Sequence, residues 1–174
     1  MSACVICGSE HDRVWELPGG ATEPAMYCAR CRKMKDDAEG TVTEVFKART
    51  GSRLYLGDWE SAQEFDGERI CVHERSPAYG VCWHMPILVV PPKSKFDRSG
   101  AIAPPERLDA VALTIDTCLT TGRKVLVHCQ GGVERSPLAV AWWHAHGDRR
   151  LLPQAYEWLK ALRPVIADRT SWLP

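Results

Sequence analysis

Residues 127–137 of this chain read Val127-His128-Cys129-Gln130-Gly131-Gly132-Val133-Glu134-Arg135-Ser136-Pro137. The apolar run at 125–127 is typical of a buried strand, and residues 137–145, which stop short of Gly147, predict a helix. The two adjacent glycines between them indicate a tight loop. The stretch therefore predicts a strand, a loop that begins with a cysteine, and a helix.

Strand and helix patterns alternate around this stretch. Residues 41–48 and 53–56 flank Thr50-Gly51 and predict a hairpin, and short strands are predicted at 70–72 and 85–90. Helices are predicted from Pro105 to before Gly122 and from Pro153 to before Pro164. The apolar positions expected in the core are Leu108, Val111, Ile115 and Cys118 in the first of these helices and Ala155, Trp158, Leu159 and Leu162 in the second. This alternation predicts an α/β fold with a central mixed, mostly parallel sheet flanked by helices.

The first 40 residues have a different pattern. Cys4 and Cys7, then Cys28 and Cys31, form two Cys-x2-Cys pairs in a segment too small to bury a core of its own. Four thiolates complete a tetrahedral shell, which favours a structural zinc ion over iron or a redox dithiol. We predict a zinc-ribbon or knuckle module over residues 1–40 and an α/β domain over residues 41–174.

Composition excludes several classes of protein. The 174 residues are 45% hydrophobic and 25% charged, with 22 basic and 22 acidic side chains, so no net charge attracts nucleic acid or an anionic membrane. The first 40 residues carry 5 basic and 7 acidic side chains, which disfavours nucleic-acid binding by the module but leaves it open. No apolar run is long enough to span a membrane, and no secretory signal is evident. We therefore expect a cytoplasmic protein with reduced cysteines.

The residue types in the cysteine loop point to oxyanion chemistry. Backbone N–H groups beside a helix N-terminus bind anions, and Gly131 and Gly132 let the backbone approach a phosphate closely. Arg135 offers two parallel donors to phosphate oxygens. The same positive groups are expected to lower the pKa of the Cys129 thiol from about 8.5, which makes it a nucleophile. The alternative is a buried cysteine beside a glycine turn.

The motif VHCQGGVERS resembles the His-Cys-x5-Arg-Ser/Thr signature of the cysteine-dependent protein tyrosine phosphatases, in particular the small dual-specificity branch. The resemblance extends over most of residues 41–174, through Leu54-Tyr55-Leu56-Gly57, residues 70–73 and Arg163-Pro164-Val165-Ile166. It implies hydrolysis of phosphotyrosine, and of phosphoserine or phosphothreonine, in phosphorylated protein partners. The implied path is a cysteinyl-phosphate intermediate with no catalytic cofactor.

The same resemblance implies roles for residues of the signature. Cys129 would be the nucleophile, and Arg135 would bind the phosphate and stabilise the transition state. Ser136 would ease departure of the thiolate, its alternative being a helix N-cap. His128 would support the loop and would not act as a general base. The phosphate-binding loop would comprise Gln130, Gly131, Gly132, Val133, Glu134 and Arg135.

The reaction also needs an acid to protonate the leaving oxygen, and the resemblance implies an upstream loop aspartate. Asp97, 32 residues before Cys129, is the carboxylate of the loop at 91–103 and is the predicted acid. Its alternative is a solvated aspartate among basic residues. Asp58 and Asp66 are weaker candidates. Asp109 and Asp116 are expected to lie on a helix and to face solvent.

Other functions stay open at this level. A Glu134 carboxylate beside the phosphate would disfavour heavily charged substrates. If its side chain points away, this objection does not apply, and hydrolysis of RNA 5′-phosphates or phosphoinositides stays an alternative. A phosphate-binding module of weak activity, sulfur transfer and arsenate reduction are others. Cys71, Cys82 and Cys118 are expected in the core, and Cys71 is the candidate for a protective disulfide with Cys129.

Overall fold

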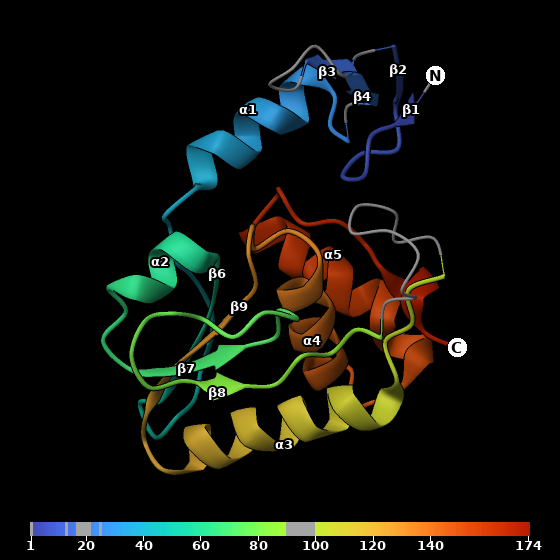
Figure 1. Cartoon of the computed structure of the whole chain (residues 1–174). Helices are drawn as coiled ribbons and strands as arrows, with labels where there is room; N and C mark the ends of the chain where they lie inside the picture. The colour runs from blue at the N-terminus through green and yellow to red at the C-terminus, as the bar shows by residue number, and fades with distance from the viewer. Residues whose placement is uncertain (1, 13, 17–21, 25, 90–99) are drawn as a thin grey trace. The chain divides into compact units, whose positions relative to one another are not determined.

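The computed structural model describes the whole chain except residues 1, 13, 17–21, 25 and 90–99. It divides into two compact units, Met1–Ala38 and Glu39–Pro174 (Figure 1). The first unit holds the two Cys-x2-Cys pairs, and the second unit holds the cysteine loop.

The first unit consists of short strands and one helix. Strand β1 (Ser2–Ala3) pairs with β2 (Glu10–His11), and β3 (Val14–Glu16) pairs with β4 (Thr22–Pro24), both antiparallel. Cys31 is the buried residue of helix α1 (Ala29–Ala38), and Cys4 is buried as well. Hydrophobic packing among the described residues is therefore a weak source of stability for this unit.

A five-stranded sheet in the order β5-β6-β9-β7-β8 forms the centre of the second unit. Strand β5 pairs antiparallel with β6, and the other neighbouring strands are parallel. The expected mixed, mostly parallel sheet and the hairpin around Thr50-Gly51 are confirmed. The strands are β5 (Thr43–Lys47), β6 (Arg53–Gly57), β7 (Glu68–Cys71), β8 (Trp83–His84) and β9 (Lys124–His128).

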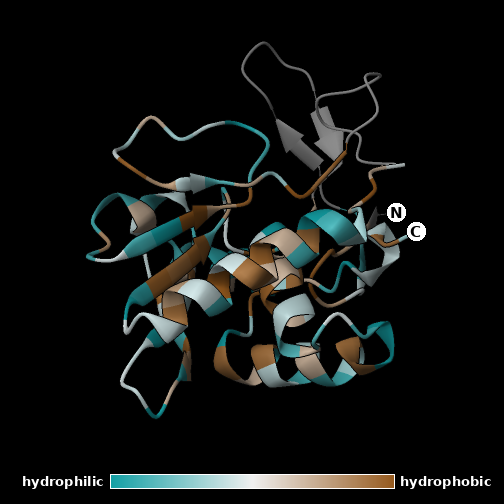
Figure 2. Ribbon diagram, turned by 90° about the horizontal axis from the view of Figure 1, so that it is seen from below, coloured by the Kyte–Doolittle hydropathy of each residue, from teal (hydrophilic) through white to brown (hydrophobic). Residues whose placement is uncertain are grey.

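Helices α3 (Pro105–Thr120) and α4 (Arg135–His144) pack against β6 and β9, and α5 (Leu152–Leu162) packs against α4. The four apolar positions expected for the first predicted helix are all buried on α3. Figure 2 shows hydrophobic and hydrophilic residues side by side along the helices, as amphipathic helices require. No helix in the described part of the chain has the length and apolar composition to cross a bilayer. Helix α2 (Trp59–Gln63) and the 3-10 helices η1 (Arg149–Leu151) and η2 (Thr170–Trp172) complete the elements described.

Two expected elements differ in the structure. The strand expected at 85–90 is displaced to β8, because Pro86 has no N–H to continue the sheet ladder. Ile87 and Leu88 are buried by packing instead, and Val89 forms an isolated antiparallel bridge with Ile102. Val90 lies outside the described residues.

The apolar face of α5 also differs from expectation. Ala155 and Leu159 are buried as predicted, but Trp158 is only partly buried and Leu162 is 42% exposed. The chain leaves the helix at Arg163, so Leu162 lies at the end of α5, and Leu152 and Tyr156 take core positions instead.

A matched pair of leucines on α3 tests the core. Leu108 is fully buried, whereas Leu113 is 68% exposed. Leu108→Ala should lower the free energy of unfolding by about 2–5 kcal/mol because it leaves a cavity, and Leu113→Ala should change it by less than about 0.5 kcal/mol. Urea denaturation followed by circular dichroism measures both, and equal losses would contradict the packing of α3.

Candidate active site

Cys129 lies at the carboxyl end of the central strand β9. Cys129 directly follows β9, whose last residue, His128, pairs with Gly57 at the end of β6 and with Cys71 at the end of β7. Because these strands are parallel, their carboxyl ends meet at the same edge. Helix α4 begins at Arg135, so the loop at 129–134 connects the end of a strand with a helix N-terminus, as the sequence predicts.

Gly132 allows the loop to lie against the neighbouring strand. It has a φ of +62°, and a Cβ atom at this position would lie 2.8 Å from the backbone oxygen of Gly57 and 3.1 Å from a terminal nitrogen of Arg163. A side chain at this residue would therefore be both strained and in steric conflict with backbone.

Ser136 places a hydroxyl beside the cysteine sulfur. Its Oγ lies 3.3 Å from Cys129 Sγ and 3.4 Å from the backbone oxygen of Gly57. Glu134 occupies the N-cap position of α4, so the alternative that Ser136 caps this helix is wrong. Because Ser136 lies inside the first turn, its hydroxyl is directed to the sulfur instead.

The electrostatics of the loop favour a thiolate. Cys129 is 1% exposed, and this burial by itself raises the pKa of its thiol. The charge of Arg135 and hydrogen bonds from Ser136 and the Gly132 N–H outweigh the burial, so the pKa lies below the ordinary thiol value. The sulfur is thus placed and charged as a nucleophile requires.

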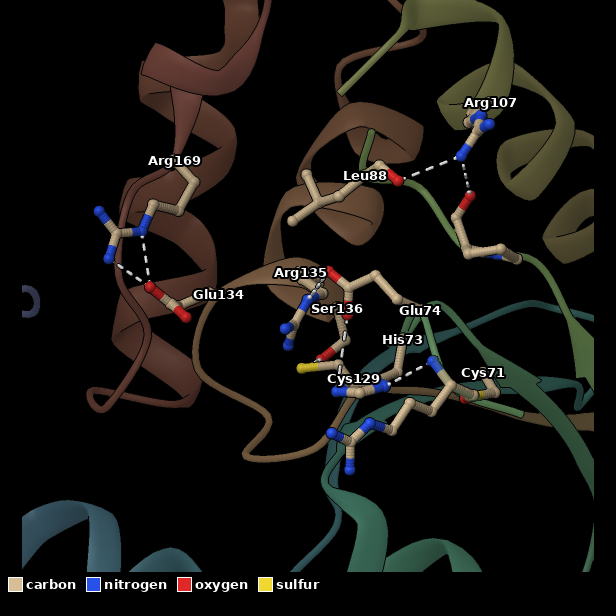
Figure 3. A network of polar contacts seen from close by, with 12 residues as sticks. Cys71, His73, Glu74, Leu88, Arg107, Cys129, Glu134, Arg135, Ser136 and Arg169 are labelled. Atoms are coloured by element: carbon tan, nitrogen blue, oxygen red, sulfur yellow. Dashed lines mark hydrogen bonds and ion pairs between the residues drawn. The ribbon is translucent and has the colours of Figure 1, made fainter. Parts of the chain in front are cut away.

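Arg135 is 4% exposed and is held by a residue that sequence reasoning missed. Its Nε donates to Glu74 Oε1 at 2.9 Å, and Figure 3 shows this contact beside Cys129 and Ser136. Glu74 lies three residues beyond β7, the parallel neighbour of β9. Its position just after a predicted strand was the available signal, because the ends of parallel strands converge.

Glu134 points away from the reactive sulfur. Its carboxylate is buried and accepts from Arg169 Nε at 2.8 Å, on the side of the loop opposite to Cys129 in Figure 3. The predicted repulsion of highly charged substrates depended on a carboxylate beside the phosphate. Since Arg169 neutralises Glu134 behind the loop, that reason for excluding them is removed.

His128 is a fully buried support for the loop. One of its ring nitrogens, Nε2, shares a hydrogen bond with the Tyr79 hydroxyl, and the Trp59 ring lies 6.1 Å away, edge-on. Burial lowers the pKa of His128 to about 4, so the ring is neutral near pH 7. The backbone N–H of Trp59 donates to the carbonyl of Gln130 at 3.1 Å, which links α2 to the loop.

The C-terminal segment supports the back of the loop. The Ala167 N–H donates to the Val133 carbonyl at 2.8 Å. Arg163, which belongs to the Arg-Pro segment of the resemblance, is 3% exposed and donates to the hydroxyl of Thr43 at 3.1 Å. Burial lowers the pKa of Arg163, although the nearby Asp58 and Cys129 oppose that effect.

Asp97 lies outside the described residues, so its predicted role as the acid stays a prediction. Asp58 is 3% exposed and caps α2 by accepting from the Ser61 N–H at 2.8 Å, while the Asp66 side chain is fully exposed. Neither carboxylate contacts a described residue of the cysteine loop through a hydrogen bond or ion pair. Asp109 and Asp116 are exposed as expected, and each accepts a hydrogen bond from a tryptophan indole.

The four N-terminal cysteines converge as their spacing predicts. The sulfur atoms of Cys4, Cys7, Cys28 and Cys31 all lie within 4.8 Å of one another. Cys7 Sγ and Cys28 Sγ, one from each pair, are 3.7 Å apart. These separations and the four soft donors fit a tetrahedral zinc site.

All eight cysteines are thiols in the structure. Cys71 and Cys118 are buried as expected, whereas Cys82 is half-buried. Cys71 lies at the end of β7, the strand next to β9, and pairs there with His128. Burial raises the pKa of the Cys71 thiol to about 11. The protective disulfide with Cys129 stays a prediction.

Comparisons with known proteins give one matching family model and several solved structures of similar fold. Residues 97–173 match the family model described as dual specificity phosphatase, catalytic domain. A leucine rich repeat and phosphatase domain containing protein from Entamoeba histolytica aligns with a TM-score of 0.53 and 14% identity, over 76% of this chain and 85% of that chain. A mutant form of Tk-PTP aligns with a TM-score of 0.53 and 18% identity, over 75% of this chain and 89% of that chain. The search of curated proteins returned no match.

Two glycines separate backbone strain from steric conflict in the loop. Gly132 and Gly122 have φ values of +62° and +80°, but a Cβ at Gly122 would meet no atom within 4 Å. Both Gly132→Ala and Gly122→Ala should lose about 1 kcal/mol of stability from the left-handed backbone. Gly132→Ala alone should also weaken orthovanadate binding by about 10-fold or more, because the loop must move. Calorimetric titration measures this, and equal affinities in the two variants would contradict the loop geometry.

Proposed function

We propose that this protein hydrolyses phosphotyrosine and phosphoserine or phosphothreonine esters in phosphorylated proteins, and the match of residues 97–173 to the dual specificity phosphatase catalytic-domain model supports this proposal. The observation that carries the proposal is the Cys129 sulfur, which lies beside Arg135 and accepts a hydrogen bond from Ser136. A buried thiolate in an anion-binding loop has the chemistry for in-line attack on phosphorus.

In the first step, the Cys129 thiolate forms a bond to phosphorus while the bond to the ester oxygen breaks. The electron pair goes to the departing oxygen, which takes a proton from Asp97 in the proposed role of general acid. The terminal nitrogens of Arg135 and the loop N–H groups, including those of Gly131 and Gly132, stabilise the charge on the three equatorial oxygens. The product of this step is a cysteinyl-phosphate and a free hydroxyl group.

In the second step, water attacks the phosphorus and gives a proton to the Asp97 carboxylate. The sulfur–phosphorus bond breaks, and its electron pair returns to Cys129 as a thiolate. The Ser136 hydroxyl, 3.3 Å from the sulfur, stabilises that developing charge. His128 is neutral and buried, so it maintains the loop and takes no proton in either step.

We propose a structural zinc ion for the first unit. Cys4, Cys7, Cys28 and Cys31 would hold it as thiolates, and four sulfur ligands leave no open coordination position for a substrate or water. The ion would cross-link both ends of a segment that buries little apolar surface, which is the usual role of zinc in small modules. No catalytic step involves this site.

Hydrolysis of para-nitrophenyl phosphate tests the nucleophile. Cys129→Ser should abolish turnover, because a hydroxyl at this position is not ionised near pH 7. Cys82→Ser is the matched control, since Cys82 is half-buried and outside the loop, and it should keep turnover within about 2-fold. Retained turnover in Cys129→Ser would exclude Cys129 as the nucleophile.

The substrate class is then compared by kcat/KM on a phosphotyrosine peptide, a phosphothreonine peptide, phosphoinositide vesicles and 5′-phosphorylated RNA. The peptides should be the best substrates. A higher kcat/KM on the lipid or the RNA would contradict the phosphoprotein assignment. Peptide binding without hydrolysis would instead identify a phosphate-binding module.

Metal analysis tests the zinc site. The purified chain should contain one zinc ion, and Cys28→Ser should lower its zinc affinity strongly, because three thiolates remain for four positions. Cys82→Ser, outside the cluster, should bind zinc like the wild type. Inductively coupled plasma mass spectrometry after dialysis against a competing chelator measures the occupancy. Full occupancy in Cys28→Ser would contradict the four-cysteine site.

A further inference from the structure

Glu134 places a negative charge in a loop whose other groups attract anions. It occupies the N-cap position of α4, yet its side chain makes no capping hydrogen bond with the helix. The residue is instead buried, with 7% of its surface exposed. Free N–H groups at a helix N-terminus attract any nearby anion. An unrestrained carboxylate at this position would therefore oppose a phosphate at the start of α4.

Arg169 binds this carboxylate and is itself held in place. Its Nε donates to Glu134 Oε1 at 2.8 Å, and its terminal nitrogen Nη2 donates to the same oxygen (Figure 3). The guanidinium lies over the Trp172 ring, 5.1 Å from the ring centroid. The backbone N–H of Arg169 donates to the Tyr156 hydroxyl at 3.1 Å. The arginine thus meets Glu134 with little freedom to move away.

The segment from Ala167 to Trp172, which we call the C-terminal strap, is also anchored through its backbone. The Ala167 N–H donates to the Val133 carbonyl at 2.8 Å, and the Trp172 carbonyl accepts from the Ala103 N–H at 2.7 Å. The strap therefore contacts two consecutive residues of the cysteine loop. It meets Val133 through the backbone and Glu134 through a charged side chain.

The two members of the ion pair differ in their access to water. The Arg169 side chain is 20% exposed, whereas that of Glu134 is 9% exposed. Removing the carboxylate would leave a cation that water partly solvates. Removing the guanidinium would leave an almost dry anion beside the loop, which is the more costly outcome. The presence of Arg169 therefore matters more for the loop than the presence of its partner.

We propose that Arg169 is a positioning residue for the phosphate loop, which it serves by holding and neutralising the Glu134 carboxylate behind the loop. This proposal rests on the phosphatase function proposed above and deepens it. Arg169 touches neither the substrate nor the sulfur in this role. It acts through Glu134, so that the donors at the start of α4 stay available to a phosphate and to the Cys129 thiolate.

The proposal gives the two charges opposite effects on the site. An uncompensated Glu134 anion would raise the pKa of the Cys129 thiol and repel a bound phosphate, and an uncompensated Arg169 cation would do the reverse. The other groups near the sulfur, Arg135 or the Glu134 pair stay constant in this comparison. They are Arg163, Cys71, His128, Glu74, Tyr156 and Asp168.

The test compares Arg169→Gln, Glu134→Gln and the double variant in the full chain. Arg150→Gln is the matched control, because Arg150 is 88% exposed and pairs with Asp148 outside the loop. Three quantities are measured: kcat/KM on para-nitrophenyl phosphate, orthovanadate affinity at pH 7, and the pH dependence of Cys129 alkylation by iodoacetamide. Mass spectrometry of the peptide that contains Cys129 separates this thiol from the other seven.

Arg169→Gln should lose about 10-fold in kcat/KM and in orthovanadate affinity, the scale of a charged hydrogen bond. Its alkylation profile should shift to higher pH by about half a unit or more. Glu134→Gln should shift the profile to lower pH and bind orthovanadate more tightly. In the Glu134→Gln background, Arg169→Gln should cost at most about 3-fold in orthovanadate affinity, because its target is gone. Arg150→Gln should match the wild type.

A merely structural ion pair would behave differently. Both single variants would then lose orthovanadate affinity, and the double variant would lose at least as much as either. That pattern would overturn the proposal, and so would wild-type affinity or an unshifted alkylation profile in Arg169→Gln. Thermal unfolding identifies a variant that fails to fold. If Arg169→Gln is that variant, the comparison of Glu134→Gln with the double variant decides, and a loss of about 10-fold there would refute the proposal.

The failure of the proposed function has a different signature. If the wild type does not hydrolyse para-nitrophenyl phosphate, the phosphatase assignment fails. Orthovanadate binding and the alkylation profile of Cys129 still report on Glu134 and Arg169 in that case, because neither measurement requires turnover.

Discussion

A negative charge on a sulfur atom that water hardly reaches is the constraint on which the rest of this site depends. Cys129 is 1% exposed, and burial alone would keep its thiol protonated. The thiolate therefore needs compensation within the protein, which comes from Arg135, the Ser136 hydroxyl and backbone N–H groups at the start of α4. The same donors suit a phosphate, so one arrangement has the chemistry both to stabilise a thiolate and to bind a phosphate.

Such a loop works only if its backbone is held in one conformation, and the fold supplies this from several directions. The carbonyl oxygen of Gly57, at the end of β6, lies against Gly132. The Ala167 N–H of the C-terminal segment donates to the Val133 carbonyl. Arg169 neutralises Glu134 behind the loop, so an acidic residue inside the signature does not oppose the thiolate from the front. These contacts come from segments far apart in sequence, which explains why a short motif needs a whole α/β domain around it.

The sequence was informative where local periodicity determines structure. Leu108, Val111 and Ile115 indicate α3, and the spacing from Cys129 to Arg135 indicates a strand, a loop and a helix start. It was misleading where one residue prevents the structure that its neighbours favour. The apolar run at 85–90 predicts a strand, but Pro86 has no N–H for the hydrogen-bond ladder, and the strand β8 ends before it. Glu74 is 61 residues from its partner Arg135, and Arg169 is 35 residues from its partner Glu134. Pairings over such distances follow from strand order, which local patterns do not encode.

Arg135 has to satisfy two anions before any substrate arrives, the Cys129 thiolate and the Glu74 carboxylate. If both engaged the terminal nitrogens, a phosphate would have to displace one of them and leave a buried charge uncompensated. The carboxylate on Nε avoids this competition, because the guanidinium can then keep Glu74 and still offer two donors to the phosphate. Arg135 is thereby bound to Glu74 through Nε, at 2.9 Å. A guanidinium whose Nε is already bound, and which keeps two donors for an anion, is the arrangement that favours the phosphate oxygens of a transition state, where their charge is greatest.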